Sequence, residues 1–533
     1  MVGTGGALRV QLPQLGDRLG AIGAGAWPFG FGAPAAAASG QQKRKERHDR
    51  QASATSSSSS SSSISSSSSS SPRIAGRYRD DDDNDDGDGD VEALSLGDHD
   101  FPPPSHQYLR RSSKRRRRPL PRCAMFLLWL VLLLGIYGVY KYRAEKALKV
   151  RWTPDLDTLS FSQQPLAAPP HHLNTSNYRF PLRTEGRNVV DADGKRFKLV
   201  SVNWYGASDE LFVVGGLNIQ HRSVIADTIK KLGFNSVRMP YADELVTANP
   251  VVDPKLLTKN PDLVGKTALE ILAAVTTSLT DAGLAVIMNN HITAATWCCG
   301  ADPCDAGWQN DHLGPICRVR QTEEDWIRNW ETVMRPHVDD PLVIGVDLRN
   351  EVRGLWGTMP WSSWAAAAEK AGNRLLKMNS NWLVVVEGTE SGNDISGART
   401  RPVRLDVPNR LVYSAHAYGW SGWGSLGGRF VQRTYESFAA TMQWNWGYLL
   451  EQDIAPVWVG ELGASHSPGM GSRNYWANLF RYLKYHDADF GYWALNPRKP
   501  RRNAAESYAL VQDDYVTPIL DYRMKDMLEL MSQ

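Results

Sequence analysis

Residues 343–354 read VIGVDLRNEVRG, an apolar run that passes into a cluster of charged and amide side chains. Burial makes an ionised carboxylate costly. A buried strand that leads into Asn350-Glu351 therefore indicates that the carboxylate faces a cleft and serves a purpose there. A second carboxylate stands in the same setting, because Glu461 ends the apolar run PVWVGELG at residues 456–463.

Eight apolar runs predict strands, and amphipathic stretches between most of them predict helices. This alternation is typical of β/α units around a parallel sheet. Over roughly 340 residues it predicts the α/β class and a (β/α)8 TIM barrel. A doubly wound open sheet is the rival, but no glycine-rich phosphate loop follows an early strand. The expected strands are 197–204, 234–241, 284–291, 342–350, 382–389, 411–418, 456–463 and 490–497, and the expected helices are 223–233, 267–283, 323–334, 475–486 and 518–531.

Functional side chains fall at the ends of most of these strands, and in a barrel those ends converge on one face. Two carboxylates across a cleft suit hydrolysis of a glycosidic bond, in which one stays protonated and the other is an anion. The strand-end residues are Trp204, Arg238, His291, Asn350-Glu351, His416, Tyr418, Glu461 and Trp493.

The other strand-end residues can support such a pair. Arg238 would keep a neighbouring carboxylate ionised, and the Asn350 amide can bind a sugar hydroxyl. His416 and Tyr418 stand two apart on one strand, point the same way and can orient the carboxylates. Trp493 offers a flat apolar face for a sugar ring.

In this order the residues resemble glycoside hydrolase family 5, the cellulase family, over about residues 180–533. The family's recurring set is Arg on the second strand, His on the third, Asn-Glu on the fourth, His-x-Tyr on the sixth, Glu on the seventh and Trp on the eighth. The matching positions are Arg238, His291, Asn350-Glu351, His416-Ala417-Tyr418, Glu461 and Trp493, and GKRFKLVSVNWYG (194–206) is similar to the family's first strand.

The resemblance implies that Glu351 is the acid/base, that Glu461 is the nucleophile and that the anomeric configuration is retained. It also implies carboxyl groups about 5–5.5 Å apart, and it requires no metal or other cofactor. Val352 stands where the family usually has Pro, which affects the geometry of a loop and no chemistry. The segment TWCCGADPC (296–304) looks like the plant cellulase-like branch.

Tryptophan is abundant, with 19 residues in the chain. Aromatic side chains in the loops after the strands would form platforms for stacked sugar rings. We expect substrate contacts from Trp204, Trp493, Trp297, Trp356 and Trp420, and Trp308, Trp361 and Trp423 also fall in these loops.

The first 122 residues contain poly-Ser, an acidic run and a basic run, a composition that predicts a disordered region. Residues 124–140, AMFLLWLVLLLGIYGVY, are uncharged and near the lower length limit for spanning a bilayer. The heavier positive charge before them predicts a type II signal anchor with the N-terminal region in the cytoplasm. A cleavable signal peptide is the alternative. A stem at 141–180 and the barrel at 181–533 would then lie in the Golgi lumen or outside the plasma membrane.

Two features fit an exported domain. Asn174-Thr175-Ser176 is an N-glycosylation sequon. Four cysteines within 20 residues predict two disulfides. Because adjacent cysteines rarely pair, we expect Cys298 and Cys299 each to bond one of Cys304 and Cys317; a zinc site is the alternative.

The sequence thus predicts a membrane-anchored retaining β-glycosidase, endo-β-1,4-glucanase-like, whose partners are a β-glycan and the membrane. An exo-β-glucosidase, a mannanase or a transglycosylase would share the same residues. A glycan-binding barrel without activity and a structural membrane protein are the other classes. A net charge of +3 gives no indication of a nucleic-acid partner.

Overall fold

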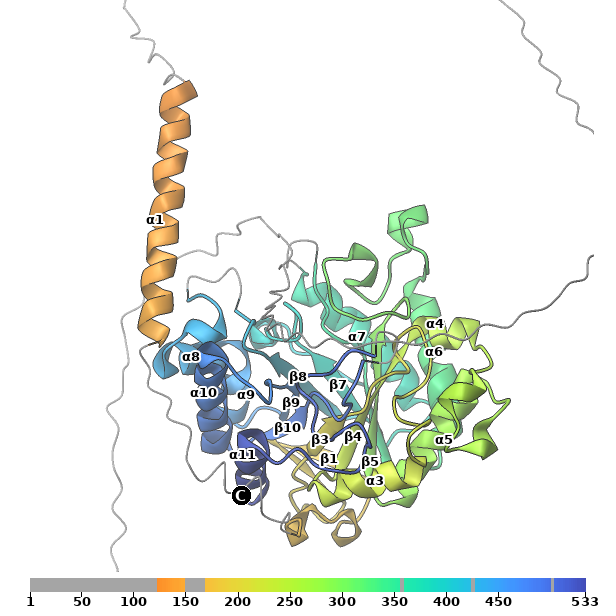
Figure 1. Ribbon diagram of the computed structural model, residues 1–533. Coiled ribbons are helices and arrows are strands. Elements are labelled where there is room, and N and C mark those ends of the chain that lie inside the picture. Colours follow the sequence, from red (N-terminus) through yellow and green to blue (C-terminus); the bar gives the residue numbers. More distant parts are fainter. Residues whose placement is uncertain (1–121, 149–167, 355–358, 423–426, 500–502) are drawn as a thin grey trace, which may run out of the picture. The chain divides into compact units, whose positions relative to one another are not determined.

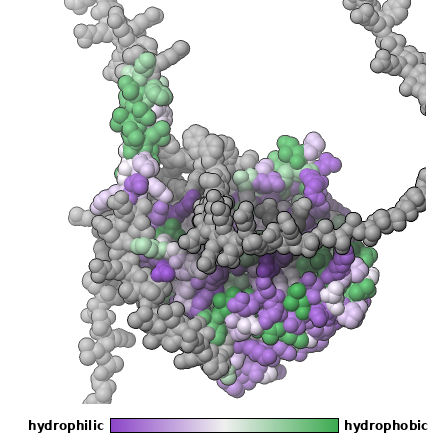
Figure 2. Space-filling model, in the orientation of Figure 1, coloured by the Kyte–Doolittle hydropathy of each residue, from purple (hydrophilic) through white to green (hydrophobic). Residues whose placement is uncertain are grey.

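The computed structural model describes residues 122–148, 168–354, 359–422, 427–499 and 503–533. The region expected to be disordered, except Arg122, lies outside the described residues, as do residues 149–167 of the expected stem. The apolar segment forms helix α1 (Arg122–Leu148). By length and composition, Cys123–Arg143 is long and apolar enough to cross a membrane. Figure 2 shows its hydrophobic surface in green.

Eight parallel strands form a closed barrel, as the sequence predicts, and helices surround it (Figure 1). The barrel closes where β10 pairs with β3. The strands are β3 (Val200–Asn203), β4 (Ser236–Ala242), β5 (Ala285–Ile292), β6 (Val343–Asp347), β7 (Leu383–Glu387), β8 (Leu411–Ala417), β9 (Val457–Leu462) and β10 (Asp489–Tyr492).

The five predicted helices are present, and the sequence marks where some of them begin. Thr267 and Thr322 form capping boxes at the starts of α5 (Ala268–Asp281) and α6 (Glu323–Met334), which satisfy backbone N–H groups that have no partner within the helix. The predicted helices are α3 (Arg222–Lys231), α5 (Ala268–Asp281), α6 (Glu323–Met334), α10 (Met470–His486) and α11 (Tyr522–Met531). Further helices are α4 (Asp243–Ala248), α7 (Trp361–Leu376), α8 (Tyr435–Met442) and α9 (Tyr448–Glu451).

The N-terminal end of the barrel is closed by a hairpin that the sequence analysis did not predict. It consists of β1 (Arg183–Glu185) and β2 (Asn188–Val190), which pair antiparallel. Apolar side chains of this region, including Leu182 and Phe197, pack against inward-facing strand residues such as Trp458. The closed apolar end leaves the polar ends of the strands at the opposite, C-terminal end of the barrel.

The closeness of β6 and β7 depends on a glycine. A Cβ at Gly345 would lie 2.5 Å from the carbonyl oxygen of Leu383 on the neighbouring strand. The hydrogen-bonded backbone of a closed barrel can shift to relieve this contact only at a cost in free energy. We expect Gly345→Ala to lower the free energy of unfolding by about 1–3 kcal/mol, measured by thermal and urea denaturation.

Gly300→Ala is the matched control, because no atom lies within 4 Å of a Cβ built there. Equal stability of the two variants would contradict this account of the β6–β7 contact.

Candidate active site

The C-terminal end of the barrel gathers a dense set of polar and aromatic side chains, most of them buried, from the strands and the residues that follow them. Among them, Arg238 is the centre of the hydrogen-bond network and is fully buried. The set comprises Asn203, Arg238, Asn289, His291, Asp347, Asn350, Glu351, Glu387, His416, Tyr418, Glu461 and Trp493.

Arg238 binds three carboxylates at once. Its Nε donates to Asp347 Oδ2 at 2.7 Å, one terminal nitrogen donates to Glu387 Oε1 at 2.9 Å, and the other donates to Glu461. One cation cannot neutralise three buried anions. Burial, and then the charge of Asp347, accordingly raise the pKa of Glu387 well above its ordinary value.

Arg238 also fixes two amides. It donates to Asn203 Oδ1 at 2.9 Å and to Asn350 Oδ1 at 2.8 Å. These bonds leave the amide nitrogen of Asn350 pointing away from the guanidinium and toward the cleft wall. The residue next in sequence, Glu351, is thereby placed beside the network.

Glu351 lies at the start of the loop after β6, with a φ of 47°. Such a left-handed conformation costs a non-glycine residue of order 1–3 kcal/mol. A hydrogen bond from its backbone nitrogen to Glu387 Oε2, 2.7 Å long, holds it there. Burial is the largest influence on its carboxyl group and raises the pKa to about 7, against the opposing charges of Arg353 and Arg238.

Glu461 lies across the cleft from Glu351. The nearest carboxyl oxygens of the two residues and a ring nitrogen of His416 all lie within 4.8 Å of one another. His416 Nδ1 is 3.3 Å from Glu351 Oε1 and 3.7 Å from Glu461 Oε2. Burial lowers the pKa of His416 to about 4, so that the ring is neutral at pH 7.

Tyr418 donates a hydrogen bond to Glu461 Oε2 at 2.8 Å. Burial, and then the charge of Glu461, raise the pKa of Tyr418 well above its ordinary value, so the hydroxyl keeps the proton that it donates. Arg238 and Tyr418 therefore hold Glu461 from two directions and fix its orientation.

The two carboxylates open into a cavity of about 370 Å³. Its wall contains aromatic rings with stacking partners: Trp493 stacks on Tyr205 and on His291, and Trp420 stacks on Tyr418. The Lys499 ammonium lies 4.1 Å from the centre of the Trp297 ring. The cavity is lined among others by Glu351, Glu461, Trp297, Trp420, Trp493, Asp209 and Glu506.

One predicted tryptophan does not line this cavity. Trp204 is fully buried, and its indole N–H donates to Gly215 O, so the predicted substrate contact is wrong. Side chains alternate along a strand, and since Asn203 points into the barrel toward Arg238, Trp204 faces the opposite way. Trp356, like Trp423, lies outside the described residues.

The predicted disulfide pairing is also wrong. Cys298 bonds its neighbour Cys299, and Cys304 bonds Cys317. Pairing of neighbours required a local backbone geometry that residue spacing alone does not indicate. Because all four cysteines form disulfides, they do not form the zinc site that was the alternative.

Several residues of the site were missed by the sequence analysis. Glu387 ends the predicted strand 382–389 and was the third carboxylate in a strand-end position, so a signal for it existed. Asp347 stood in the stretch 343–354 without an assigned role. Asn203 and Asn289 carried no signal that separates them from ordinary strand residues.

A closed parallel barrel with two carboxyl groups facing each other across an aromatic cleft is an arrangement suited to glycoside hydrolysis. The family model for "Cellulase (glycosyl hydrolase family 5)" matches residues 190–499. The chain belongs to this family of O-glycosyl hydrolases.

Relatives agree with this assignment. An endoglucanase of Paenibacillus polymyxa is 32% identical over 349 residues, which cover 63% of this chain and 83% of that protein. A glycosyl hydrolase 5 family protein of Chamaecyparis obtusa is 26% identical over 382 residues, covering 66% of this chain and 64% of that protein. The solved structure of a hyperthermophilic endocellulase from the archaeon Pyrococcus horikoshii has the same fold, with a TM-score of 0.55 and 24% identity over 66% of this chain and 98% of that one.

The raised pKa of Glu351 predicts that this group lowers the stability of the folded chain as the pH rises. The pKa of this carboxyl group is ordinarily 4.5 and rises to about 7 in the folded chain. At a pH between these two values, the folded chain holds a proton that the unfolded chain has released. The free energy of unfolding that this group contributes therefore falls as pH rises through that window. Because Gln cannot ionise, we expect Glu351→Gln to gain up to about 3 kcal/mol over the wild type between pH 4.5 and pH 8.

Urea denaturation of both chains at the two pH values measures this gain. Glu436→Gln, at an exposed position on α8, controls for loss of a carboxylate elsewhere. A Glu351→Gln gain that is the same at both pH values would refute the proposed burial effect.

Proposed function

We propose that this chain is a membrane-anchored, retaining endo-β-1,4-glucanase in which Glu461 is the nucleophile and Glu351 the acid/base. The observation that carries the proposal is the spacing of the pair, whose nearest oxygens lie within 4.8 Å of each other. Retaining glycosidases hold their carboxyl groups about 5–5.5 Å apart, whereas inverting ones leave roughly 6.5–9.5 Å for a water molecule.

The environments of the two groups suit the two roles. In the first step Glu461, oriented by Arg238 and Tyr418, attacks the anomeric carbon while Glu351 gives its proton to the departing oxygen. A pKa of about 7 allows Glu351 to hold that proton near neutral pH. In the second step Glu351 takes a proton from water, and the water displaces Glu461 with the original configuration restored.

The cleft supports a β-linked glycan as substrate. Trp297, Trp420 and Trp493 line the same cavity as the two carboxylates, and aromatic faces bind the apolar faces of sugar rings. The Paenibacillus polymyxa relative is an endoglucanase, which favours a β-glucan as the first substrate to test.

Hydrolysis by the full-length chain, purified in detergent, tests the activity. The panel contains carboxymethyl cellulose, a mannan and aryl β-cellobiosides. We expect hydrolysis of the β-glucan, and a loss of at least about a thousandfold in Glu461→Gln because the covalent route requires the carboxylate. Glu436→Gln should retain wild-type rates.

Three results would count against the proposal. Undiminished activity in Glu461→Gln would remove Glu461 from the chemistry. A folded wild type that binds cello-oligosaccharides and cleaves none of the panel would favour a glycan-binding barrel. Release of single glucose units without a fall in the viscosity of the polymer would favour an exo-β-glucosidase.

The proposed anchor places the barrel on the exported side, in the Golgi or at the plasma membrane. Asn174 is exposed, and its side-chain oxygen accepts hydrogen bonds only from nearby Ser176 among the described contacts. The sequon is thus accessible to modification.

Expression in a eukaryotic cell tests this topology. We expect the chain to stay in carbonate-washed membranes and to show a mobility shift with peptide N-glycosidase that Asn174→Gln abolishes. Release by carbonate would contradict the anchor, and an unshifted wild type would contradict the exported position of Asn174.

A further inference from the structure

The two disulfides of this chain differ in what they can do for stability. Cys304 and Cys317 are 13 residues apart, and closing such a loop in the unfolded chain is worth about 3 kcal/mol. Cys298 and Cys299 are neighbours, so their bond closes almost no loop and restricts the unfolded chain very little. A role for the Cys298–Cys299 disulfide must therefore come from the contacts that its sulfur atoms make.

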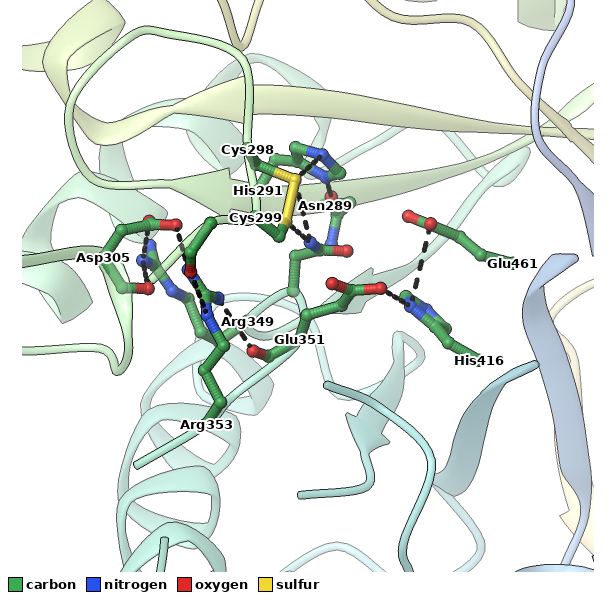
Figure 3. Close-up of a disulfide and its surroundings, with 12 residues drawn as sticks. Asn289, His291, Cys298, Cys299, Asp305, Arg349, Glu351, Arg353, His416 and Glu461 are labelled. Carbon is green, nitrogen blue, oxygen red and sulfur yellow. Dashed lines mark hydrogen bonds and ion pairs between the residues drawn. A yellow bond between two sulfur atoms is a disulfide. The ribbon is translucent and has the colours of Figure 1, made fainter. Parts of the chain in front are cut away.

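Both sulfur-bearing residues line the cavity that holds Glu351 and Glu461. The Asn350 amide nitrogen is 3.2 Å from Cys299 Sγ and 3.7 Å from Cys298 Sγ. Figure 3 shows the disulfide beside the His291 ring, above Glu351 in this view. The disulfide is thus part of the cleft surface.

The contact with Asn350 has a defined direction. The amide oxygen accepts from Arg238 at 2.8 Å, so the amide nitrogen is the atom that faces the sulfurs. Arg238 and the disulfide hold the amide from its two ends. Because Glu351 follows Asn350 directly, a rotation of this amide would displace groups next to the acid/base.

The contact with His291 depends on the oxidation state. His291 Nδ1 lies 2.9 Å from Asn289 Oδ1, while the Asn289 amide nitrogen donates to Asp347; the ring proton is therefore on Nδ1. Burial lowers the pKa of His291 well below its ordinary value, so the ring is neutral. Nε2 presents its lone pair to Cys298 Sγ at 3.2 Å, and a reduced thiol there would become a hydrogen-bond donor to it.

We propose that the Cys298–Cys299 disulfide is a positioning element of the active site, which holds Asn350 and His291 for the chemistry between Glu351 and Glu461. This inference rests on the proposed function. Reduction breaks the S–S bond, and each sulfur takes up one proton while the two thiols of the reductant become a disulfide. The two separated sulfurs can no longer hold their neighbours in the same places, and small displacements of catalytic groups cost up to about a hundredfold in rate.

Substitution in the full-length chain is the first test. We expect Cys298→Ala/Cys299→Ala to lower kcat on a soluble β-glucan by about ten- to a hundredfold, with KM changed less than about threefold and the thermal midpoint nearly unchanged. The matched control, Cys304→Ser/Cys317→Ser, removes the other disulfide and should lower the thermal midpoint while leaving kcat within about threefold at a temperature where the chain is folded.

A reversible test avoids dependence on the folding of a double variant. In the Cys304→Ser/Cys317→Ser chain, dithiothreitol can reduce only the Cys298–Cys299 disulfide among the described cysteine pairs. A chelator is included, because His291 and the two thiols would offer three metal-ligand atoms within 4.8 Å. We expect kcat to fall on reduction and to recover on reoxidation.

The outcomes separate this inference from the proposed function. An active wild type whose kcat is unaffected by the Cys298→Ala/Cys299→Ala substitution and by reduction would overturn the positioning role alone. A fall in activity that only follows a fall in the thermal midpoint would do the same. A folded wild type without activity would overturn the proposed function and this inference together.

Discussion

The candidate active site depends on one guanidinium that is shared by three carboxylates in the buried interior of the barrel. Arg238 is fully buried, and it contacts Asp347, Glu387 and Glu461. An unpaired charge in such a place is costly, and removal of one partner of a buried pair typically costs about 3–5 kcal/mol. The network therefore requires β4, β6, β7 and β9 to bring their ends together, and the closed barrel is the fold that does so. The hairpin at the other end completes the constraint by covering the apolar half of the barrel interior.

Glu351 and Glu461 have different surroundings, and burial is the largest influence on the pKa of Glu351. Glu461 accepts hydrogen bonds from Arg238 and from the Tyr418 hydroxyl. The side chain of Glu351, among the described contacts, has only the neutral His416 ring as its hydrogen-bonding neighbour, at 3.3 Å. Glu387 receives the backbone N–H of Glu351 and fixes its left-handed conformation. Under the proposed mechanism, these neighbours suit two groups of the same chemistry, on opposite sides of one cleft, to different tasks.

Much of this arrangement could be predicted from the sequence, because the signals were local. Apolar strands that end in Asn350-Glu351, His416 and Glu461 marked both the barrel and its functional end. The failures arose where the outcome depends on three-dimensional neighbours. Trp204 follows an inward-facing Asn203 and therefore packs outside the barrel, Cys298 pairs with the residue beside it, and the hairpin at 183–190 is too short to show a strand pattern. Glu387 could have been found, since it ends a predicted strand as Glu461 does.

The central claim is that Glu461 forms a covalent bond with the sugar while Glu351 protonates the leaving group. Incubation of the full-length chain with 2,4-dinitrophenyl 2-deoxy-2-fluoro-β-cellobioside tests it most directly. The fluorine slows both steps, while the good leaving group lets the first proceed, so the covalent intermediate accumulates. Mass spectrometry of the digested protein should then place one fluorocellobiosyl group on the peptide that contains Glu461. A label on another residue, or inactivation without any label, would contradict the account.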